Sequence, residues 1–349
     1  MHYLTSLEIC AGGGGQALGL EQAGFHPVVL VENDRYACAT LRANRPEWNV
    51  IEKDVREFSA LTYRGRVDLL AGGVPCPPFS LAGKQLGADD ERDLFPTALR
   101  LVAEAQPRAV MLENVRGIFS KSFDDYRNRI LAELREMGYA PEWRLLNASD
   151  YGVPQLRPRA VLVAIRNDVE QQFVWPAGTG QPSPTVGETL LDAMSSGGWQ
   201  GAIEWKDRAN GIAPTIVGGS KKHGGPDLGP TRAKQAWAAL GVNGHILAKD
   251  PPAPEFEGTP SLTVKMVAAL QGFPPDWNIE GSKTTAYRQV GNAFPPPVAR
   301  AVGVQIYRAL SASLKPHVLV SKNGCKVAGK TKREYESNPE QRQQAGASA

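Results

Sequence analysis

The sequence predicts an α/β fold in which a mainly parallel sheet is covered by helices on both faces. Short β-rich runs alternate with stretches of helical spacing over roughly the first 166 residues. A Gly-rich turn, acidic residues and a proline-flanked cysteine stand at the ends of several of these runs, where an open α/β sheet binds its ligands. With 349 residues, of which 42% are hydrophobic, the chain is long enough for about two domains.

The expected elements follow one another in a regular order. The runs that we expect to form strands are Leu4–Cys10, Pro27–Glu32, Val50–Val55, Val67–Ala71, Ala109–Val115 and Arg159–Arg166. The helical spacing predicts helices over Gln16–Ala23, Arg35–Asn44, Leu94–Ala105 and Phe123–Met137. Such alternation favours parallel strands that are joined by helical crossovers.

The pattern changes after Asn167, where Pro, Gly, Trp and Thr become frequent and helices scarce, apart from a candidate helix at Thr231–Leu240. We expect residues 167–275 to form a second, smaller domain that is rich in loops and strands. A helix-like stretch at Pro297–Leu310 rejoins the first domain, which would comprise residues 1–166 and 276–312. Residues 313–349 are polar and basic, and we expect them to form a flexible tail.

The composition excludes several classes of protein. The sequence contains no apolar run long enough to span a membrane and no basic leader before its first strand-like segment, so we expect a cytoplasmic protein without a membrane anchor. The four cysteines form neither a CxxC pair nor a cluster with metal-ligand spacing. They are Cys10, Cys38, Cys76 and Cys325. We therefore expect no disulfide framework and no metal site.

The charge is distributed unevenly. The net charge is only +3, and the stretch Lys315–Arg333 is basic and contains no acidic residue. A second basic stretch, Trp205–Lys234, has six Lys or Arg against two Asp, which would suit a nucleic-acid backbone. An ordinary solvated loop explains the same charges equally well.

Features of a cofactor site follow the first three expected strands. The turn Ala11–Gly15 lets the backbone approach a ligand closely, although it would serve as a connector or hold several kinds of nucleotide. Glu32 ends the next strand about 20 residues later, where an acid accepts hydrogen bonds from both hydroxyls of a ribose. Asp54 ends the third strand and could accept a hydrogen bond from an adenine amino group. For both Glu32 and Asp54, the alternative is an exposed acid at the end of a strand. No GKS or GKT sequence follows the turn, which argues against a nucleoside triphosphate.

A nucleophile and an acid are expected at the same edge of the sheet. Cys76 lies between prolines after the fourth strand, a rigid setting that suits a thiol attacking an electrophilic carbon at a fixed angle. Glu113 ends the fifth strand, where a protonated carboxyl group could donate to a ring nitrogen of a bound base. Taken singly, Glu113 could equally be a capping or salt-bridged acid. Together, the two residues indicate an acid and nucleophile pair beside a cofactor turn.

Four separated motifs follow one another along the chain: Pro75-Cys76, Glu113–Val115, Gln155–Arg159 and Gln289–Ala293. In this order they resemble the signature blocks of the DNA cytosine-5 methyltransferase family of bacterial modification enzymes. The resemblance covers roughly residues 4–166 and 260–305. It implies a Rossmann-like S-adenosylmethionine-dependent methyltransferase domain, with a smaller target recognition domain that is rich in loops and strands.

The resemblance also implies a reaction. Cys76 would attack carbon 6 of a cytosine flipped out of a specific duplex DNA sequence, while Glu113 stabilises the protonated ring nitrogen 3. Carbon 5 would then take the methyl group from S-adenosylmethionine, which leaves S-adenosylhomocysteine, and water would remove the proton from carbon 5. Arg157 and Arg159 would contact the carbonyl oxygen of the cytosine and support the thiolate or the active-site loop. As an isolated pair they would be ordinary surface residues.

Binding residues are carried over by the same resemblance. The expected cofactor-binding residues are Cys10, Ala11, Gly12, Gly14, Gly15, Glu32, Asn33, Asp54, Val55, Pro75, Asn292 and Ala293. The expected DNA-binding residues are Ser80, Lys84, Gln85 and Arg92 in a segment similar to the family's active-site loop, Thr215 in a Thr-Leu-like element, and the basic pair Lys221 and Lys222. The resemblance further implies a monomer, a location at the bacterial nucleoid and a cognate restriction endonuclease as a genetic partner.

Two alternatives remain open. One is an RNA cytosine-5 methyltransferase on the same scaffold, which the long region 167–273 and the lack of a Cys-Phe-Thr block disfavour. The other is a catalytically silent DNA-binding regulator, against which the intact Cys76, Glu113 and arginine pair argue.

Overall fold

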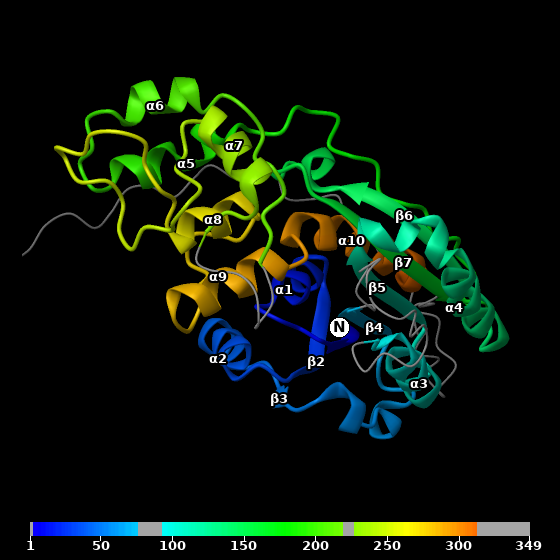
Figure 1. Cartoon of the computed structure of the whole chain (residues 1–349). Coiled ribbons are helices and arrows are strands. Elements are labelled where there is room, and N and C mark those ends of the chain that lie inside the picture. Colours follow the sequence, from blue (N-terminus) through cyan, green and yellow to red (C-terminus); the bar gives the residue numbers. More distant parts are fainter. Residues whose placement is uncertain (1–2, 76–92, 219–226, 313–349) are drawn as a thin grey trace, which may run out of the picture. The chain divides into compact units, whose positions relative to one another are not determined.

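The computed structural model describes residues 3–75, 93–218 and 227–312. Within these ranges one seven-stranded sheet has the order β3-β2-β1-β4-β5-β7-β6 (Figure 1). Strands β1 to β5 are parallel, and β7 lies antiparallel between β5 and β6. The strands are β1 (Leu4–Ile9), β2 (Phe25–Glu32), β3 (Val50–Glu52), β4 (Leu69–Gly73), β5 (Ala109–Val115), β6 (Tyr139–Asn147) and β7 (Pro158–Arg166).

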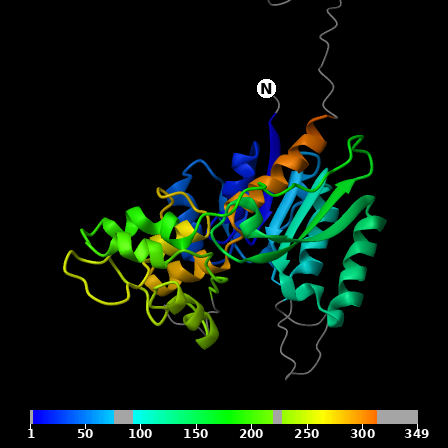
Figure 2. The ribbon, with the colours of Figure 1, turned by 90° about the horizontal axis from the view of Figure 1, so that it is seen from above.

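Helices cover both faces of the sheet. They are α1 (Gly15–Gln22), α2 (Arg35–Asn44), α3 (Phe95–Ala105), α4 (Asp124–Glu136) and α10 (Pro296–Ser311). Side chains alternate along each strand, so Val110 and Leu112 of β5 face the core beneath α3 and α4, while Met111 faces the core beneath α10. Figure 2 shows α10 and the helices α3 and α4 on opposite sides of the strands. The predicted α/β architecture is confirmed.

Most expected elements agree with the observed ones to within a few residues, and two strands differ for physical reasons. The third strand ends at Glu52 because Asp54 accepts a hydrogen bond from Arg56 N and begins a 3₁₀ turn over Val55–Glu57. Strand β6 was not expected. It is an edge strand that is mostly exposed and contains a proline, so it lacks the apolar pattern of the buried strands.

The region after β7 differs from the expectation of a strand-rich domain. In its described parts, 167–218 and 227–275, it contains helices and no strand. These helices are α5 (Val186–Ser195), α6 (Ala202–Arg208), α7 (Thr231–Ala239) and α8 (Val264–Leu270), and α9 (Lys283–Asn292) leads back to α10. A capping box between Thr185 and Glu188 begins α5. The helices are too short to give a clear periodic signal among the prolines and glycines that surround them.

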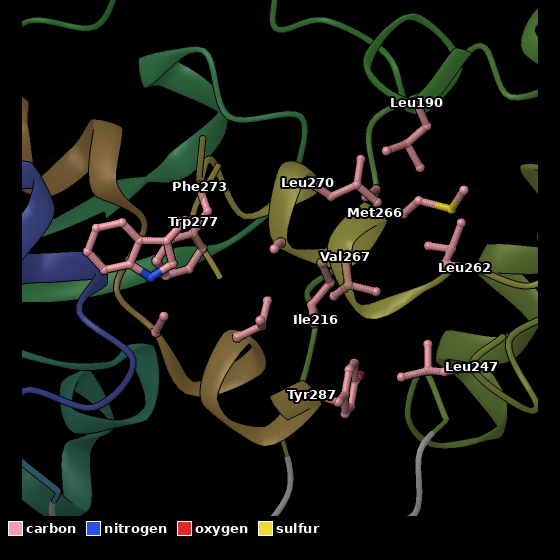
Figure 3. Packing of buried hydrophobic residues seen from close by; sticks show 14 of the residues in the cluster. Leu190, Ile216, Leu247, Leu262, Met266, Val267, Leu270, Phe273, Trp277 and Tyr287 are labelled. Carbon is pink, nitrogen blue, oxygen red and sulfur yellow. The ribbon is translucent and has the colours of Figure 1, made fainter. Parts of the chain in front are cut away.

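One apolar cluster joins these helices to the sheet side of the fold. It includes Leu190, Trp237 and Leu270 as well as Leu18 and Leu41 from α1 and α2. Figure 3 shows part of it, with side chains of α5, α8 and α9 packed together. Residues 1–314 form one compact unit. The domain boundaries at residues 166/167 and 275/276 therefore stay a prediction. None of the helices in the described ranges is long and apolar enough to cross a bilayer.

Candidate active site

A cavity of about 560 Å³ lies at the carboxyl ends of β1, β2, β4 and β5. Its walls come from the segments that follow these strands, together with Arg159 of β7 and several residues between 288 and 294. This is the edge at which open α/β sheets bind ligands. Most of the described residues that were expected to bind the cofactor line this cavity. They are Cys10, Ala11, Gly12, Gly15, Glu32, Asn33, Val55, Pro75, Asn292 and Ala293.

The Gly-rich turn has backbone conformations and contacts that require glycine. Gly12 and Gly14 have φ values of 54° and 87°, in the left-handed region. A Cβ atom on Gly15 would lie 2.3 Å from Phe294 O, so the turn packs tightly against the segment before α10. Gly14 does not line the cavity; its Cβ would point at Leu41 and Trp277, each 2.8 Å away. A glycine contacts a ligand through its backbone, so the assignment of Gly14 to the cofactor stays a prediction.

Glu32 closes one side of the Gly-rich turn. Its Oε2 accepts a hydrogen bond from Gly12 N at 2.7 Å, and its Oε1 accepts from Asn33 N and Asp34 N at 2.8 Å each. These bonds fix the carboxylate at the end of β2 on the cavity wall. Carboxylate oxygens each accept more than one hydrogen bond, so the position remains able to receive a ligand hydroxyl.

Asp54 differs from its expected role. Its carboxylate pairs with the guanidinium of Arg56 at 2.5 Å, and this hydrogen-bonded pair lowers the pKa of Asp54. Asp54 does not line the cavity, whereas its neighbours Lys53 and Val55 do. The side chain thus caps a 3₁₀ turn instead of facing a ligand.

Glu113 and Arg159 form a buried ion pair on the cavity wall. Arg159 Nε lies 2.7 Å from Glu113 Oε1, and the two side chains are 10% and 9% exposed. Burial raises the pKa of Glu113, while the positive charges of Arg159 and Arg157 act in the opposite direction. A carboxyl group in this setting holds a proton more readily than one in water, as an acid that donates to a bound base requires.

Arg157 is not on the cavity wall, although it was expected beside Arg159. Its side chain is fully buried and donates hydrogen bonds to Ile216 O at 2.5 Å, Gly291 O at 2.7 Å and Ala293 O at 3.0 Å. Side chains two positions apart in a strand point to the same face of the sheet. Arg157, however, precedes β7, and its side chain turns into the protein. Arg157 therefore stabilises the backbone, and the expectation that it contacts a base was wrong.

Val74 and Pro75, which precede Cys76 in the sequence, line the cavity. Val74 N donates to Glu113 O at 3.1 Å, and Asn114 Nδ2 donates to Val74 O at 2.7 Å. Cys76 itself lies outside the described residues. The same holds for the expected DNA contacts Ser80, Lys84, Gln85, Arg92, Lys221 and Lys222.

Thr215 is the one expected DNA contact within the described residues. Its hydroxyl donates to Leu156 O, which ties the segment before Ile216 to the loop before β7. It does not line the cavity.

Several polar residues of the cavity wall were given no role in the sequence analysis. Glu8 and Gln16 flank the Gly-rich turn. Glu8 could have been identified from the sequence, because it is a charged residue inside an apolar strand. Arg288 and Gln289 come from α9, where Arg288 pairs with Asp34 at 3.2 Å and Gln289 accepts from Thr40 at 2.7 Å. Burial raises the pKa of Cys10, and that of Cys38 to about 12, so neither thiol is prepared for nucleophilic attack.

The sheet and its cavity define a class of protein. The order β3-β2-β1-β4-β5-β7-β6, with β7 antiparallel and a Gly-rich turn after β1, is that of the S-adenosylmethionine-dependent methyltransferase fold. The solved structure of a Spodoptera frugiperda DNMT2 variant has the same fold, with a TM-score of 0.63 at 19% identity over 87% of this chain and 99% of that one. The S. pombe Dnmt2 methyltransferase matches with a TM-score of 0.59 at 16% identity, over 89% of this chain and 100% of that one.

The family follows from the sequence comparisons. The model for C-5 cytosine-specific DNA methylase matches residues 4–308, and the chain belongs to this family. It is 58% identical to the type II methyltransferase M.NaeI of Lentzea aerocolonigenes, over 89% of this chain and 76% of that protein. It is 54% identical to the type II methyltransferase M.NgoMIV of Neisseria gonorrhoeae, over 88% of this chain and 98% of that protein. The protein is thus a DNA cytosine-5 methyltransferase, as its motifs predicted.

Proposed function

We propose that this enzyme methylates carbon 5 of a flipped-out cytosine in a specific duplex DNA sequence, with S-adenosylmethionine as the methyl donor and Cys76 as the nucleophile. The observation that carries the proposal is the buried pair of Glu113 and Arg159 in the same cavity as the Gly-rich turn and Glu32. A base-activating acid and a cofactor turn thus share one space. Pro75, which precedes Cys76 in the sequence, lies on the wall of that space.

The cavity fits the proposed cofactor. Its volume of about 560 Å³ is in the range of small-molecule sites, and it has apolar walls from Val31, Val55 and Leu94 for an adenine ring. The carboxyl groups of Glu8 and Glu32 favour a cationic ligand and would repel a triphosphate. When bound, the cofactor supplies a methyl group on a sulfonium. We propose that the residues assigned to it keep their expected roles, except Asp54.

The protein residues then perform four tasks. The thiolate of Cys76 attacks carbon 6 of the cytosine, and Glu113 supplies a proton to ring nitrogen 3, so that carbon 5 becomes nucleophilic. Arg159 holds Glu113 in place and donates to the carbonyl oxygen of the base. After methyl transfer, water removes the proton from carbon 5 and the thiolate leaves.

Recognition of the DNA falls to other parts of the chain. Rotating the cytosine out of the duplex costs a few kcal/mol, which contacts to the DNA backbone must offset. We assign contacts to the DNA phosphates to Lys221 and Lys222 in a recognition region over residues 167–275, which also contributes Thr215 as a DNA contact. Further DNA contacts are assigned to Ser80, Lys84, Gln85 and Arg92 in the segment after Cys76. These assignments rest on the resemblance of the motifs.

The biological setting follows from the relatives. Since M.NaeI and M.NgoMIV are type II methyltransferases, we propose that this enzyme belongs to a restriction–modification system with a cognate endonuclease. It would act as a monomer on the DNA of a bacterial nucleoid.

The test is to incubate the purified enzyme with S-adenosylmethionine and DNA of mixed sequence, and to map modified cytosines by bisulfite sequencing. We expect one short sequence context to be modified. The Cys76→Ala variant should give no modification and still bind S-adenosylhomocysteine, because the change removes the nucleophile and leaves the cavity. Normal turnover by Cys76→Ala would refute the nucleophile, and equal methylation of tRNA and duplex DNA would refute the choice of substrate.

A further inference from the structure

A hydrogen bond outside the cavity joins α4 to the chain just before α3. The hydroxyl of Tyr126, in the first turn of α4, donates to Asp93 Oδ1 at 2.5 Å. The same oxygen accepts a hydrogen bond from Phe95 N at 3.0 Å, one of the N–H groups that the first turn of a helix leaves without a helical partner. Asp93 is only 8% exposed, so its carboxylate is fixed by these two donors rather than by water.

The ring of Tyr126 is held by other aromatic rings. It meets the fully buried ring of Phe95 edge-on, with 5.9 Å between the centroids. Phe123 meets Tyr126 in the same way at 6.0 Å, and Phe95 also packs against Trp143 of β6. Edge-to-face contacts favour one orientation of a ring. The hydroxyl of Tyr126 therefore has a defined position next to Asp93.

The residue after Asp93 is paired with the strand end on the cavity wall. Leu94 N donates to Pro75 O at 3.3 Å, and both residues line the cavity. The residue before Pro75 is held in turn, since Val74 N donates to Glu113 O at 3.1 Å. Backbone hydrogen bonds thus connect the start of α3 with the strand end that carries the proposed acid.

We propose that Tyr126 is a positioning residue for methyl transfer, which acts through Asp93 on the backbone pair of Pro75 and Leu94. Tyr126 does not line the cavity, so it affects the reaction through other residues. The inference rests on the proposed function, because Pro75 directly precedes Cys76 in the sequence. A nucleophile must meet its target carbon at a fixed distance and angle, and a displacement of about 1 Å can cost about 10²-fold in rate. Without the Tyr126 hydroxyl, the start of α3 and the Pro75 backbone bonded to it can shift.

The experiment is Tyr126→Phe in the full-length enzyme, which removes the hydroxyl and keeps the ring against Phe95. The rate of methyl transfer to unmodified DNA is measured in a single turnover, with enzyme in excess and S-adenosylmethionine at saturation. Affinities for S-adenosylhomocysteine and for DNA are measured separately. We expect the rate to fall about tenfold and both affinities to change by less than about twofold, because the change disturbs the geometry of the reaction and leaves the binding surfaces in place.

The matched control is Tyr139→Phe. The hydroxyl of Tyr139 donates to Pro107 O at 2.6 Å, at the start of β6 and at the edge of the sheet opposite the cavity. Each substitution removes one hydroxyl that donates to an oxygen, so both should lower the unfolding temperature by a similar amount. Only Tyr126→Phe should slow methyl transfer. Equal losses of rate in the two variants would show a general effect on stability and would overturn the proposal.

Variants of Asp93 test the route of the effect. Asp93→Asn keeps an acceptor oxygen for Tyr126 and Phe95 and should retain most of the wild-type rate. Asp93→Ala removes the acceptor and should slow methyl transfer at least as much as Tyr126→Phe.

The double variant Tyr126→Phe/Asp93→Ala should be no slower than Asp93→Ala alone, since both changes remove the same interaction. Losses that multiply in the double variant, or a wild-type rate for Tyr126→Phe, would overturn the positioning role. If the wild-type enzyme itself transferred no methyl group to DNA, the proposed function would be wrong instead.

Discussion

The guanidinium of Arg159 lies 2.7 Å from the carboxylate of Glu113, and the sheet fixes this relationship. In the antiparallel pairing of β5 with β7, Glu113 stands opposite Val161, two residues from Arg159. Both side chains therefore point to the same face of the sheet, toward the cavity. The reversed direction of β7 thus brings a cation to the strand end that carries the acid.

Replacing Glu113 by Gln should lower kcat by about 10²–10⁴-fold, because an amide cannot supply a proton to ring nitrogen 3. The active form of Glu113 is protonated, and burial raises its pKa, so activity that depends on it falls as pH rises through that pKa. The variant should lack this alkaline decline. Single-turnover rates measured against pH will check both points, with the affinity for S-adenosylhomocysteine as a control that should not change.

Replacing the two arginines of the segment Gln155–Arg159 should have different effects, on stability for Arg157 and on turnover for Arg159. Arg157→Met leaves the buried carbonyl oxygens of Ile216 and Gly291 without this donor, and each unpaired buried group costs about 1–3 kcal/mol. Ala293 O keeps a hydrogen bond from Gln271 Nε2 at 2.7 Å. We expect a loss of several kcal/mol in the free energy of unfolding, measured by urea denaturation.

Arg159→Met should lower turnover much more than stability, since its guanidinium faces the cavity and its partner Glu113 can become protonated. A variant at position 157 as stable as the wild type would show that Arg157 does not brace the backbone.

The sequence predicted the sheet edge well because parallel strands end at the same edge, whatever their lateral order. Glu32 and Glu113 are both on the cavity wall for that reason. Sequence cannot show which way a side chain turns after a strand. Asp54 was expected at the same edge, but its carboxylate forms an ion pair with the nearby guanidinium of Arg56.

The region after β7 was harder to predict because its stability comes from contacts distant in sequence. Trp237 of α7 and Leu270 of α8 are fully buried in a core that also includes Leu41 of α2. Helices of seven to ten residues are marginal alone, so tertiary packing decides their formation. Local patterns of Pro and Gly therefore gave the wrong expectation of strands.

Glu32→Ala should weaken S-adenosylhomocysteine by at least about tenfold, because it removes an acceptor for the ribose hydroxyls and frees three backbone N–H groups. Glu32→Gln keeps one acceptor oxygen and should have a smaller effect. Calorimetric titration gives both values, and Glu52→Ala at the exposed end of β3 is the control. The ribose role would be wrong if Glu32→Ala bound the ligand as tightly as the wild type.

Gly291 should be sensitive to the addition of any side chain. A Cβ atom there would lie 2.4 Å from Gly218 Cα and 2.5 Å from Gly218 N, so two backbones would have to separate. Gly291 is within helix α9, where Ala would otherwise be favoured by about 1 kcal/mol. We nevertheless expect Gly291→Ala to lower the free energy of unfolding by about 2 kcal/mol or more.

The same substitution should weaken S-adenosylhomocysteine, because Asn292 and Ala293 follow directly and line the cavity. The control is Gly138→Ala, which has a φ of 87° but no atom within 4 Å of the added Cβ. It should lower the free energy of unfolding by about 1–2 kcal/mol through backbone strain alone and leave ligand binding unchanged. If Gly291→Ala instead stabilised the enzyme, as helix propensity alone predicts, the close packing of Gly218 on α9 would be disproved.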